Sequence, residues 1–132
     1  MAERKKVSTG TKWEKLAGYS RAIKTGNWIQ VSGTTATDDN GDLVGRDDPY
    51  EQAIFIIRKI ERALNELDAT IEDVVRTRIY LVRNDDWEAV SRAHGEVFGE
   101  IRPANTLIVI QGLIGDGYLV EIEADALLED DA

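Results

Sequence analysis

The chain has 132 residues, no cysteine and a formal net charge of −9 at pH 7. Its length fits one domain over residues 1–132, and without cysteine it can form neither a disulfide nor a thiolate metal site. We expect a cytoplasmic protein without a membrane span, since no apolar run approaches the roughly 20 residues that a transmembrane helix needs. The acidic charge argues against nucleic acid as a partner, because phosphate binding depends on Lys and Arg.

The first predicted element is a β-hairpin. Its strands run over residues 19–24 and 28–34 and are joined by Thr25-Gly26-Asn27, where the glycine allows a positive φ. A polar loop over residues 36–48 follows. Pro49 then opens a helix. Apolar residues recur after it at three- and four-residue steps, which predicts one buried helix face.

The segment over residues 74–82 is predicted to be a strand. Because successive side chains of a strand point to opposite faces, Val74, Arg76 and Arg78 should lie on one face of the sheet and Val75 on the other. The two arginines share a face that we expect to meet another subunit. Ion pairing across that interface and binding of an anion are equally good interpretations of them.

A second helix and two strands complete the pattern. Asp86 stands where it can cap the helix, and Gly99 and Pro103 end it. Strands are predicted over residues 105–114 and 118–128, separated by a glycine-containing turn.

These elements give the order ββαβαββ, a single α+β domain with two helices on one face of a sheet. Helices can cover only one face, yet the strand over residues 105–114 has apolar residues on both of its faces. An uncovered apolar face indicates a partner. The simplest partner is another copy of the chain, in a closed symmetric assembly.

Four segments of the sequence resemble the Rid family, also called the RidA, YjgF or L-PSP endoribonuclease family. They are "GYSRAIKTGNWIQVSG", "EDVVRTRIYL", "RPANTLIVIQGL" and "VEIEADAL", in the family's order and spacing. The resemblance implies a chorismate-mutase-like sheet, in a homotrimer with a barrel-like core and a pocket at each subunit interface. It also implies hydrolysis of reactive enamine or imine intermediates to 2-keto acids and ammonia, with no metal and no bound cofactor.

The resemblance assigns residues to this pocket. Tyr19 matches the family's pocket tyrosine, Ser32 its pocket serine and Glu121 the glutamate taken to orient the attacking water. Ser91 stands where deaminases commonly carry an asparagine. Asn105 stands where they carry the arginine that holds the substrate carboxylate.

Asn105 is a departure from the deaminase pattern. An amide carries no charge, so the exchange costs a carboxylate ligand on the order of 1.5–3 kcal/mol unless another group compensates. Thr106 follows Asn105 and is expected at the rim of the same pocket. The cations available to compensate are Arg21, Arg76, Arg78 and Arg102.

Simpler interpretations stand beside these assignments. Glu121 and Glu123 alternate with Ile122, which is also the pattern of a solvent-facing strand, and the family match favours a pocket position only for Glu121. His94 lies on the inner stripe of its helix, where packing is favoured over catalysis. With one histidine and no cysteine, no metal site is expected.

Three functions remain open at this stage. The first is hydrolysis of a small carbonyl- or imine-containing acid, in which Glu121 activates water and Asn105 helps to hold the ligand. The second is non-catalytic binding of a small metabolite on the same scaffold. The third, endoribonuclease activity, is disfavoured by the acidic charge and by the lack of a second histidine.

Overall fold

A computed structural model describes residues 3–129. The elements in chain order are β1 (Arg4–Val7), α1 (Lys12–Ala17), β2 (Ala22–Thr25), β3 (Trp28–Thr34), α2 (Pro49–Glu66), β4 (Val74–Leu81), α3 (Trp87–Phe98), β5 (Ala104–Val109) and β6 (Val120–Leu127), with short 3-10 helices at Ile71–Asp73 and Asn84–Asp86. From β2 onwards this is the predicted ββαβαββ order, so the predicted α+β class is confirmed.

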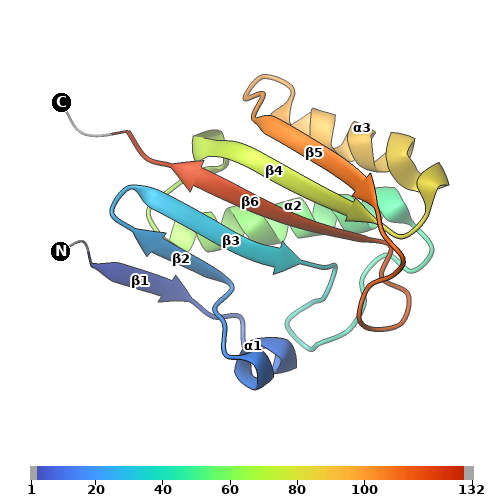
Figure 1. Cartoon of the computed structure of the whole chain (residues 1–132), viewed down its shortest axis with the longest axis horizontal. Helices are drawn as coiled ribbons and strands as arrows, with labels where there is room; N and C mark the ends of the chain where they lie inside the picture. Colours follow the sequence, from blue (N-terminus) through green and yellow to red (C-terminus); the bar gives the residue numbers. More distant parts are fainter. Residues whose placement is uncertain (1–2, 130–132) are drawn as a thin grey trace.

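The strands form one mixed sheet of six strands in the order β1-β2-β3-β6-β4-β5 (Figure 1). Neighbouring strands are antiparallel except for β4 and β5, which are parallel. Helix α3 supplies the crossover that a parallel pair requires. β1 and β5 are therefore the edges of the sheet. None of the helices between residues 3 and 129 is long and apolar enough to cross a bilayer.

Helices α2 and α3 cover one face of the sheet and leave the other face bare (Figure 1). The Asp48 side chain accepts a hydrogen bond from the Glu51 N–H (3.0 Å) and caps α2, and Pro49 opens the helix as predicted. The core lies between the helices and the sheet. Ile79 of β4 and Ile122 of β6 are buried there in one cluster with the apolar stripe of α2.

The sequence did not predict β1 and α1, and it placed the start of the hairpin too early. Val7 is the only buried residue of β1, so this strand has no apolar alternation to reveal it. Gly18 caps the C-terminal end of helix α1, and its φ of 79° is the left-handed conformation that favours glycine. Tyr19 therefore follows a helix end, and β2 begins only at Ala22.

Two details of the predicted strands were wrong. Val74 is buried and Val75 is exposed, which reverses the expected facing of both, because the pairing of β4 with β6 shifts between Val74 and Arg76. β5 ends at Val109, not at residue 114. The chain turns after it, and Gly115 and Gly117 in this segment both have positive φ.

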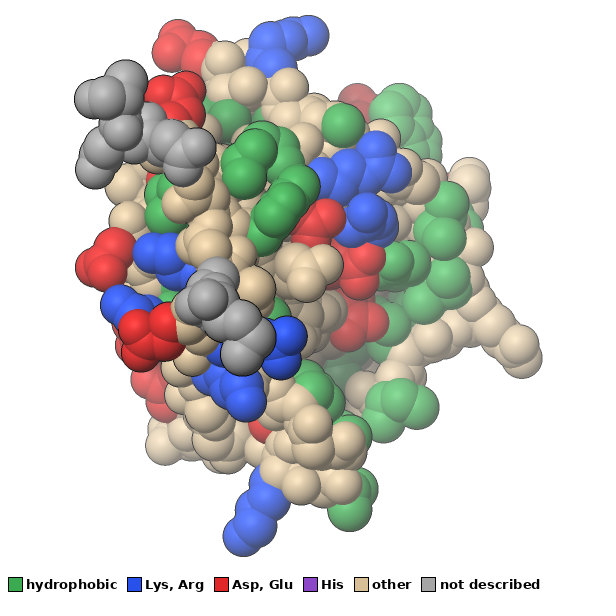
Figure 2. All heavy atoms as spheres, turned by 60° about the vertical axis from the view of Figure 1, so that its left-hand side comes forward, with side chains coloured by type: hydrophobic (Ala, Val, Ile, Leu, Met, Phe, Trp, Pro, Cys, Tyr) green, Lys and Arg blue, Asp and Glu red, His purple; other side chains and the backbone are tan. Residues whose placement is uncertain are grey.

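The bare face of the sheet carries charged and apolar side chains together. Arg78 lies 3.0 Å from the Asp125 carboxylate and 3.4 Å from that of Glu123, so the structure gives it ion pairs within its own chain. Figure 2 shows basic and acidic side chains next to one another, with hydrophobic side chains on either side of them. The large apolar side chains of this sheet that are at least 40% exposed include Trp28, Ile108 and Leu127.

Leu64→Ala should destabilise the fold, because Leu64 of α2 is fully buried in the core. We expect the free energy of unfolding to fall by about 2–5 kcal/mol, the range for truncating a buried leucine. Urea denaturation followed by circular dichroism measures it. Glu66→Ala, an exposed position on the same helix, is the matched control and should change stability by less than about 0.5 kcal/mol. Equal effects of the two substitutions would contradict the packing described.

Candidate functional site

A cavity of about 420 Å³ opens where α1, the end of β3 and the segment after β5 come together. Its charged and phenolic lining comes from elements far apart in the sequence: Tyr19, Arg21, Lys59 and Glu121. The apolar part of its wall includes Trp13, Leu16, Leu113 and Ile114. A hollow of this size, apolar with a few polar groups, suits a small-molecule ligand.

Glu121 of β6 lies against Gly33 of β3. The pairing of these strands is irregular between Val31 and Thr34, and Gly33 falls inside that irregularity. A Cβ atom on Gly33 would stand 2.6 Å from Glu121 Oε1, so a larger residue at position 33 would force the Glu121 side chain to shift. Burial raises the pKa of Glu121, and the positive charge of Arg21 partly opposes this. A carboxylate with a raised pKa is suited to accept a proton from water.

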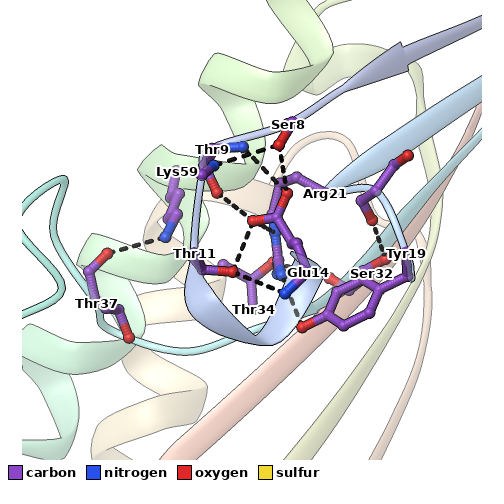
Figure 3. A network of polar contacts seen from close by, with 12 residues as sticks. Ser8, Thr9, Thr11, Glu14, Tyr19, Arg21, Ser32, Thr34, Thr37 and Lys59 are labelled. Atoms are coloured by element: carbon purple, nitrogen blue, oxygen red, sulfur yellow. Dashed lines mark hydrogen bonds and ion pairs between the residues drawn. The ribbon is translucent and has the colours of Figure 1, made fainter. Parts of the chain in front are cut away.

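The Arg21 side chain is almost fully buried and is held on several sides (Figure 3). Its Nη1 donates to the Gly33 carbonyl (2.5 Å) and to Thr34 Oγ1 (3.0 Å), and its Nη2 donates to the Tyr19 hydroxyl (3.4 Å). The guanidinium carbon also lies 5.6 Å from the centre of the Tyr19 ring, within cation–π range. Arg21 thereby fixes Tyr19 at the cavity wall.

Glu14 of α1 is the buried anion that faces Arg21, with Oε2 3.7 Å from Arg21 Nε. Its carboxylate accepts hydrogen bonds from Ser8 Oγ (3.0 Å), from the N–H (3.1 Å) and Oγ1 (2.6 Å) of Thr9, and from Thr11 Oγ1 (2.8 Å). Burial by itself would raise the pKa of Glu14, but these hydrogen bonds together lower it to about 2. Glu14 is therefore ionised at neutral pH and ties α1 to the loop before it.

Lys59 reaches the cavity from α2. The side chain is 6% exposed, and its Nζ donates to the Thr37 carbonyl oxygen (2.9 Å). Burial lowers the pKa of Lys59, and the nearby charge of Arg21 lowers it further. The surroundings of Lys59 therefore disfavour the charged form of its side chain.

Neither Glu14 nor Lys59 was predicted from the sequence as a site residue, although each had a signal. Thr11 stands three residues before Glu14 and caps α1, and this spacing is typical of a helix start. Lys59 lies between Ile56 and Ile60 on the apolar side of α2, where a charged residue is unusual.

Asn105 belongs to a separate cluster on the helix-covered side of the sheet. Its Nδ2 donates to Thr77 Oγ1 (2.9 Å), and Thr77 Oγ1 is also hydrogen-bonded to His94 Nε2 (2.8 Å). The His94 ring lies 4.5 Å from the ring of Phe98, and burial lowers the pKa of His94. The predicted packing role of His94 is confirmed. Glu121 is on the bare side of the sheet, so one chain does not bring Asn105 and Glu121 together.

The other predicted site residues also lie outside the cavity of one chain. Ser32 Oγ donates to the Ser20 carbonyl (2.7 Å), and Thr106 Oγ1 accepts from Arg76 Nη2 (2.6 Å). Ser91 is exposed on α3, one turn before His94. Of the predicted residues, the cavity takes in Tyr19, Arg21 and Glu121, and it leaves out Ser32, Arg76, Arg78, Ser91, Asn105 and Thr106. Among residues 3–129, no group of three or more His, Cys, Asp or Glu is placed to hold a metal ion.

Comparison with known proteins identifies the family. The family model named Endoribonuclease L-PSP matches residues 9–128. The chain belongs to the Rid family. This confirms the resemblance found in the sequence. A Rid-family crystal structure from Mycobacterium tuberculosis, of the YjgF/YER057c/UK114 group, shares 41% identity with a TM-score of 0.86, and the match covers 96% of this chain and all of that one (100%).

Two relatives show how broad the Rid family is. An uncharacterized protein of Streptomyces coelicolor is 41% identical over 123 residues, covering 92% of this chain and 90% of that protein. The 3-aminoacrylate deaminase RutC of Acinetobacter baylyi is 32% identical over 111 residues, covering 84% of this chain and 87% of that protein. Rid-family relatives of this chain therefore include a protein named as a deaminase.

Glu14→Gln should weaken the fold in a pH-dependent way. The pKa of Glu14 is about 2 in the folded chain against the usual 4.5, so the ionised carboxylate stabilises the fold at pH 7 and loses this effect as the pH falls from 4.5 towards 2. We expect Gln to lower the free energy of unfolding by about 1–3 kcal/mol at pH 7.

Urea denaturation at pH 7 and at lower pH values measures this difference, which should shrink on acidification. Glu61→Gln is the control and should change stability little, because Glu61 pairs with an Arg58 side chain that is largely exposed. A Glu14→Gln effect of the same size at every pH would show that the charge of Glu14 contributes nothing.

Proposed function

We propose that this Rid-family protein is a cytoplasmic homotrimeric hydrolase that adds water to enamine or imine derivatives of small carbonyl acids, at sites between its subunits. The observation that carries this proposal is Glu121, a partly buried carboxylate with a raised pKa in a cavity of small-molecule size. The relationship to a protein named 3-aminoacrylate deaminase supports the choice of reaction.

The chemistry requires only water and a proton acceptor. The Glu121 carboxylate takes a proton from water while the water oxygen bonds to the imine carbon. The proton passes to the nitrogen and gives a carbinolamine. The hydroxyl proton of this intermediate then moves through Glu121 to the nitrogen, the C–N bond breaks, and ammonia leaves as the carbonyl forms. An enamine enters the same route after protonation at carbon. Imine plus water gives carbonyl acid plus ammonia, so no oxidant or reductant takes part.

Self-association would unite the two polar clusters of the chain. Asn105 lies on β5, which is an edge strand, and bonds Thr77 of the neighbouring β4, while Glu121 lies in the cavity beyond the other side of the sheet. An edge strand with free backbone groups is a natural place for contact with another chain. In the proposed trimer, the β5 edge of one copy closes the Glu121 cavity of the next.

The bare sheet face supports the same assembly. Trp28, Ile108 and Leu127 are exposed beside the ion pairs of Arg78. An apolar surface rimmed by charged groups is the usual composition of a subunit interface. Three copies that cover one another's sheets would bury these side chains and produce the barrel-like core expected of the family.

Non-catalytic binding of a small metabolite is the second candidate. One observation favours it: the Asn105 amide donates to Thr77 Oγ1 and is thus occupied inside its own chain. An uncharged group already engaged in this way is a poor replacement for the deaminase arginine. Retention of a small acid without turnover would distinguish this candidate from the hydrolase.

Glu121→Gln should abolish hydrolysis while leaving the fold intact, because the amide cannot accept the proton from water. We expect turnover of 2-iminobutyrate, generated in situ, to fall at least about 100-fold. In the unaltered protein the rate should rise with pH as Glu121 loses its proton, with a midpoint above 4.5. Glu123→Gln, two residues along the same strand, is the control and should retain activity. Full activity of the Glu121→Gln variant would rule out Glu121 as the base.

Asn105→Arg should increase imine hydrolysis, because it adds a cation at the position from which deaminases hold the substrate carboxylate. The measurement is kcat/KM for 2-iminobutyrate, with an expected gain of about tenfold or more. Asn65→Arg, an exposed position on α2, adds the same charge elsewhere and should have no effect. An unchanged rate in an intact trimer would mean that residue 105 does not meet the substrate.

A further inference from the structure

Within the part of the chain that the structure describes, Lys59 is a buried cation without an acidic partner. The ion pairs found among residues 3–129 do not include it, and its one hydrogen bond among these residues goes to the Thr37 carbonyl. An ammonium has three N–H donors. A charge this deeply buried is unfavourable unless it is paired, so the chain maintains Lys59 at a cost to its own stability.

Arg21 also has donor capacity to spare. Its Nε is buried and has no hydrogen-bond acceptor among the described residues, since the Glu14 oxygen at 3.7 Å is too distant. Glu14 is in turn occupied by four hydrogen bonds from the loop before α1. Glu14 is thus engaged elsewhere, and both Lys59 and the Nε of Arg21 keep N–H donors that no described residue accepts.

Both cations line the same cavity as Glu121, and they lie near one another. The charge of Arg21 acts on Lys59 and on Glu121 alike. Arg21 and Glu121 both contact Gly33, from its carbonyl oxygen and from its Cα side respectively. The wall also includes the apolar side chains of Trp13, Leu16 and Ile114. The cavity lining therefore combines two cations, a carboxylate and apolar side chains.

We propose that Lys59, with Arg21 beside it, binds the carboxylate of the substrate and so makes the cavity selective for small acids with a short apolar tail. In this arrangement the substrate carboxylate accepts from the unused N–H groups of Lys59 and Arg21, the carbon next to it meets Glu121, and the tail lies along the apolar side chains of the wall. The proposal rests on the proposed function. It assigns to α2 of the same chain the charge that deaminases supply from the position of Asn105.

The test compares an acid with its neutral amide. 2-Oxobutyrate and 2-oxobutanamide differ in the charged group and keep the same tail, and isothermal titration calorimetry gives the affinity of each for the full chain. We expect the unaltered protein to bind the acid about tenfold more tightly or better. Lys59→Met should bring the two affinities to within about twofold, and Lys59→Arg should keep the preference. Equal affinities in the unaltered protein, or an unchanged preference in Lys59→Met, would overturn the proposal.

A matched control separates the cavity from general charge effects. Lys24 also donates to a backbone carbonyl, that of Leu67 (3.2 Å), but it does not line the cavity. Lys24→Met should therefore keep the preference for the acid. If it lost the preference as fully as Lys59→Met, the effect would come from net charge and the assignment would be wrong. Melting temperatures of both variants establish that they are folded.

Kinetics with 2-iminobutyrate separate this proposal from the hydrolase proposal. If Lys59→Met raises KM about tenfold and changes kcat by a smaller factor, both proposals are supported. If the protein hydrolyses the imine and Lys59→Met leaves KM unchanged, the hydrolase stands and the carboxylate assignment is wrong. If nothing is hydrolysed but acid binding still depends on Lys59, the assignment stands and the hydrolase is wrong.

Discussion

The buried guanidinium of Arg21 is the interaction on which the rest of the site depends. It donates to the Gly33 carbonyl at the end of β3, and it faces Glu14 of α1. A buried charge that loses its partners is strongly destabilising, so neither segment can move away from the other. This explains the unusual burial pattern of α1, in which the charged Glu14 is buried while the apolar Leu16 is 88% exposed. The wall of the cavity is held by polar contacts, and the apolar side chains of α1 are left free to face a ligand or another subunit.

The two polar clusters of the chain differ in charge as well as in place. The cavity holds Arg21, Lys59 and Glu121, all ionisable and largely shielded from water. The other cluster consists of Asn105 of β5, Thr77 of β4 and His94 of α3, and burial favours the neutral form of the histidine. In our proposals the charged cavity supplies both the base and the carboxylate-binding group, while the neutral cluster closes the site from a second copy. Under these proposals, Lys59 would take over the task that the arginine performs in deaminases.

Much of the fold could be predicted because its signals are local. The apolar stripe of α2 repeats within each helical turn, and the hairpin of β2 and β3 is fixed by Gly26 at its tip. The mistakes occurred where local signals were weak. Val75 lies at an irregularity in the pairing of β4 with β6. β1 has one buried residue and forms by pairing with β2. No pattern within either segment encodes the strand that it meets.

The sequence by itself determined the α+β class, the family and three residues of the cavity: Tyr19, Arg21 and Glu121. Only the tertiary structure decided that Glu14 and Lys59 accompany them and that Asn105 stands on the opposite side of the sheet. The reason is that a helix or strand is specified by neighbours a few residues apart. Burial of a charge, by contrast, depends on groups such as Thr37 and Gly33 that approach from other elements, and these meet only when the sheet and its helices have assembled.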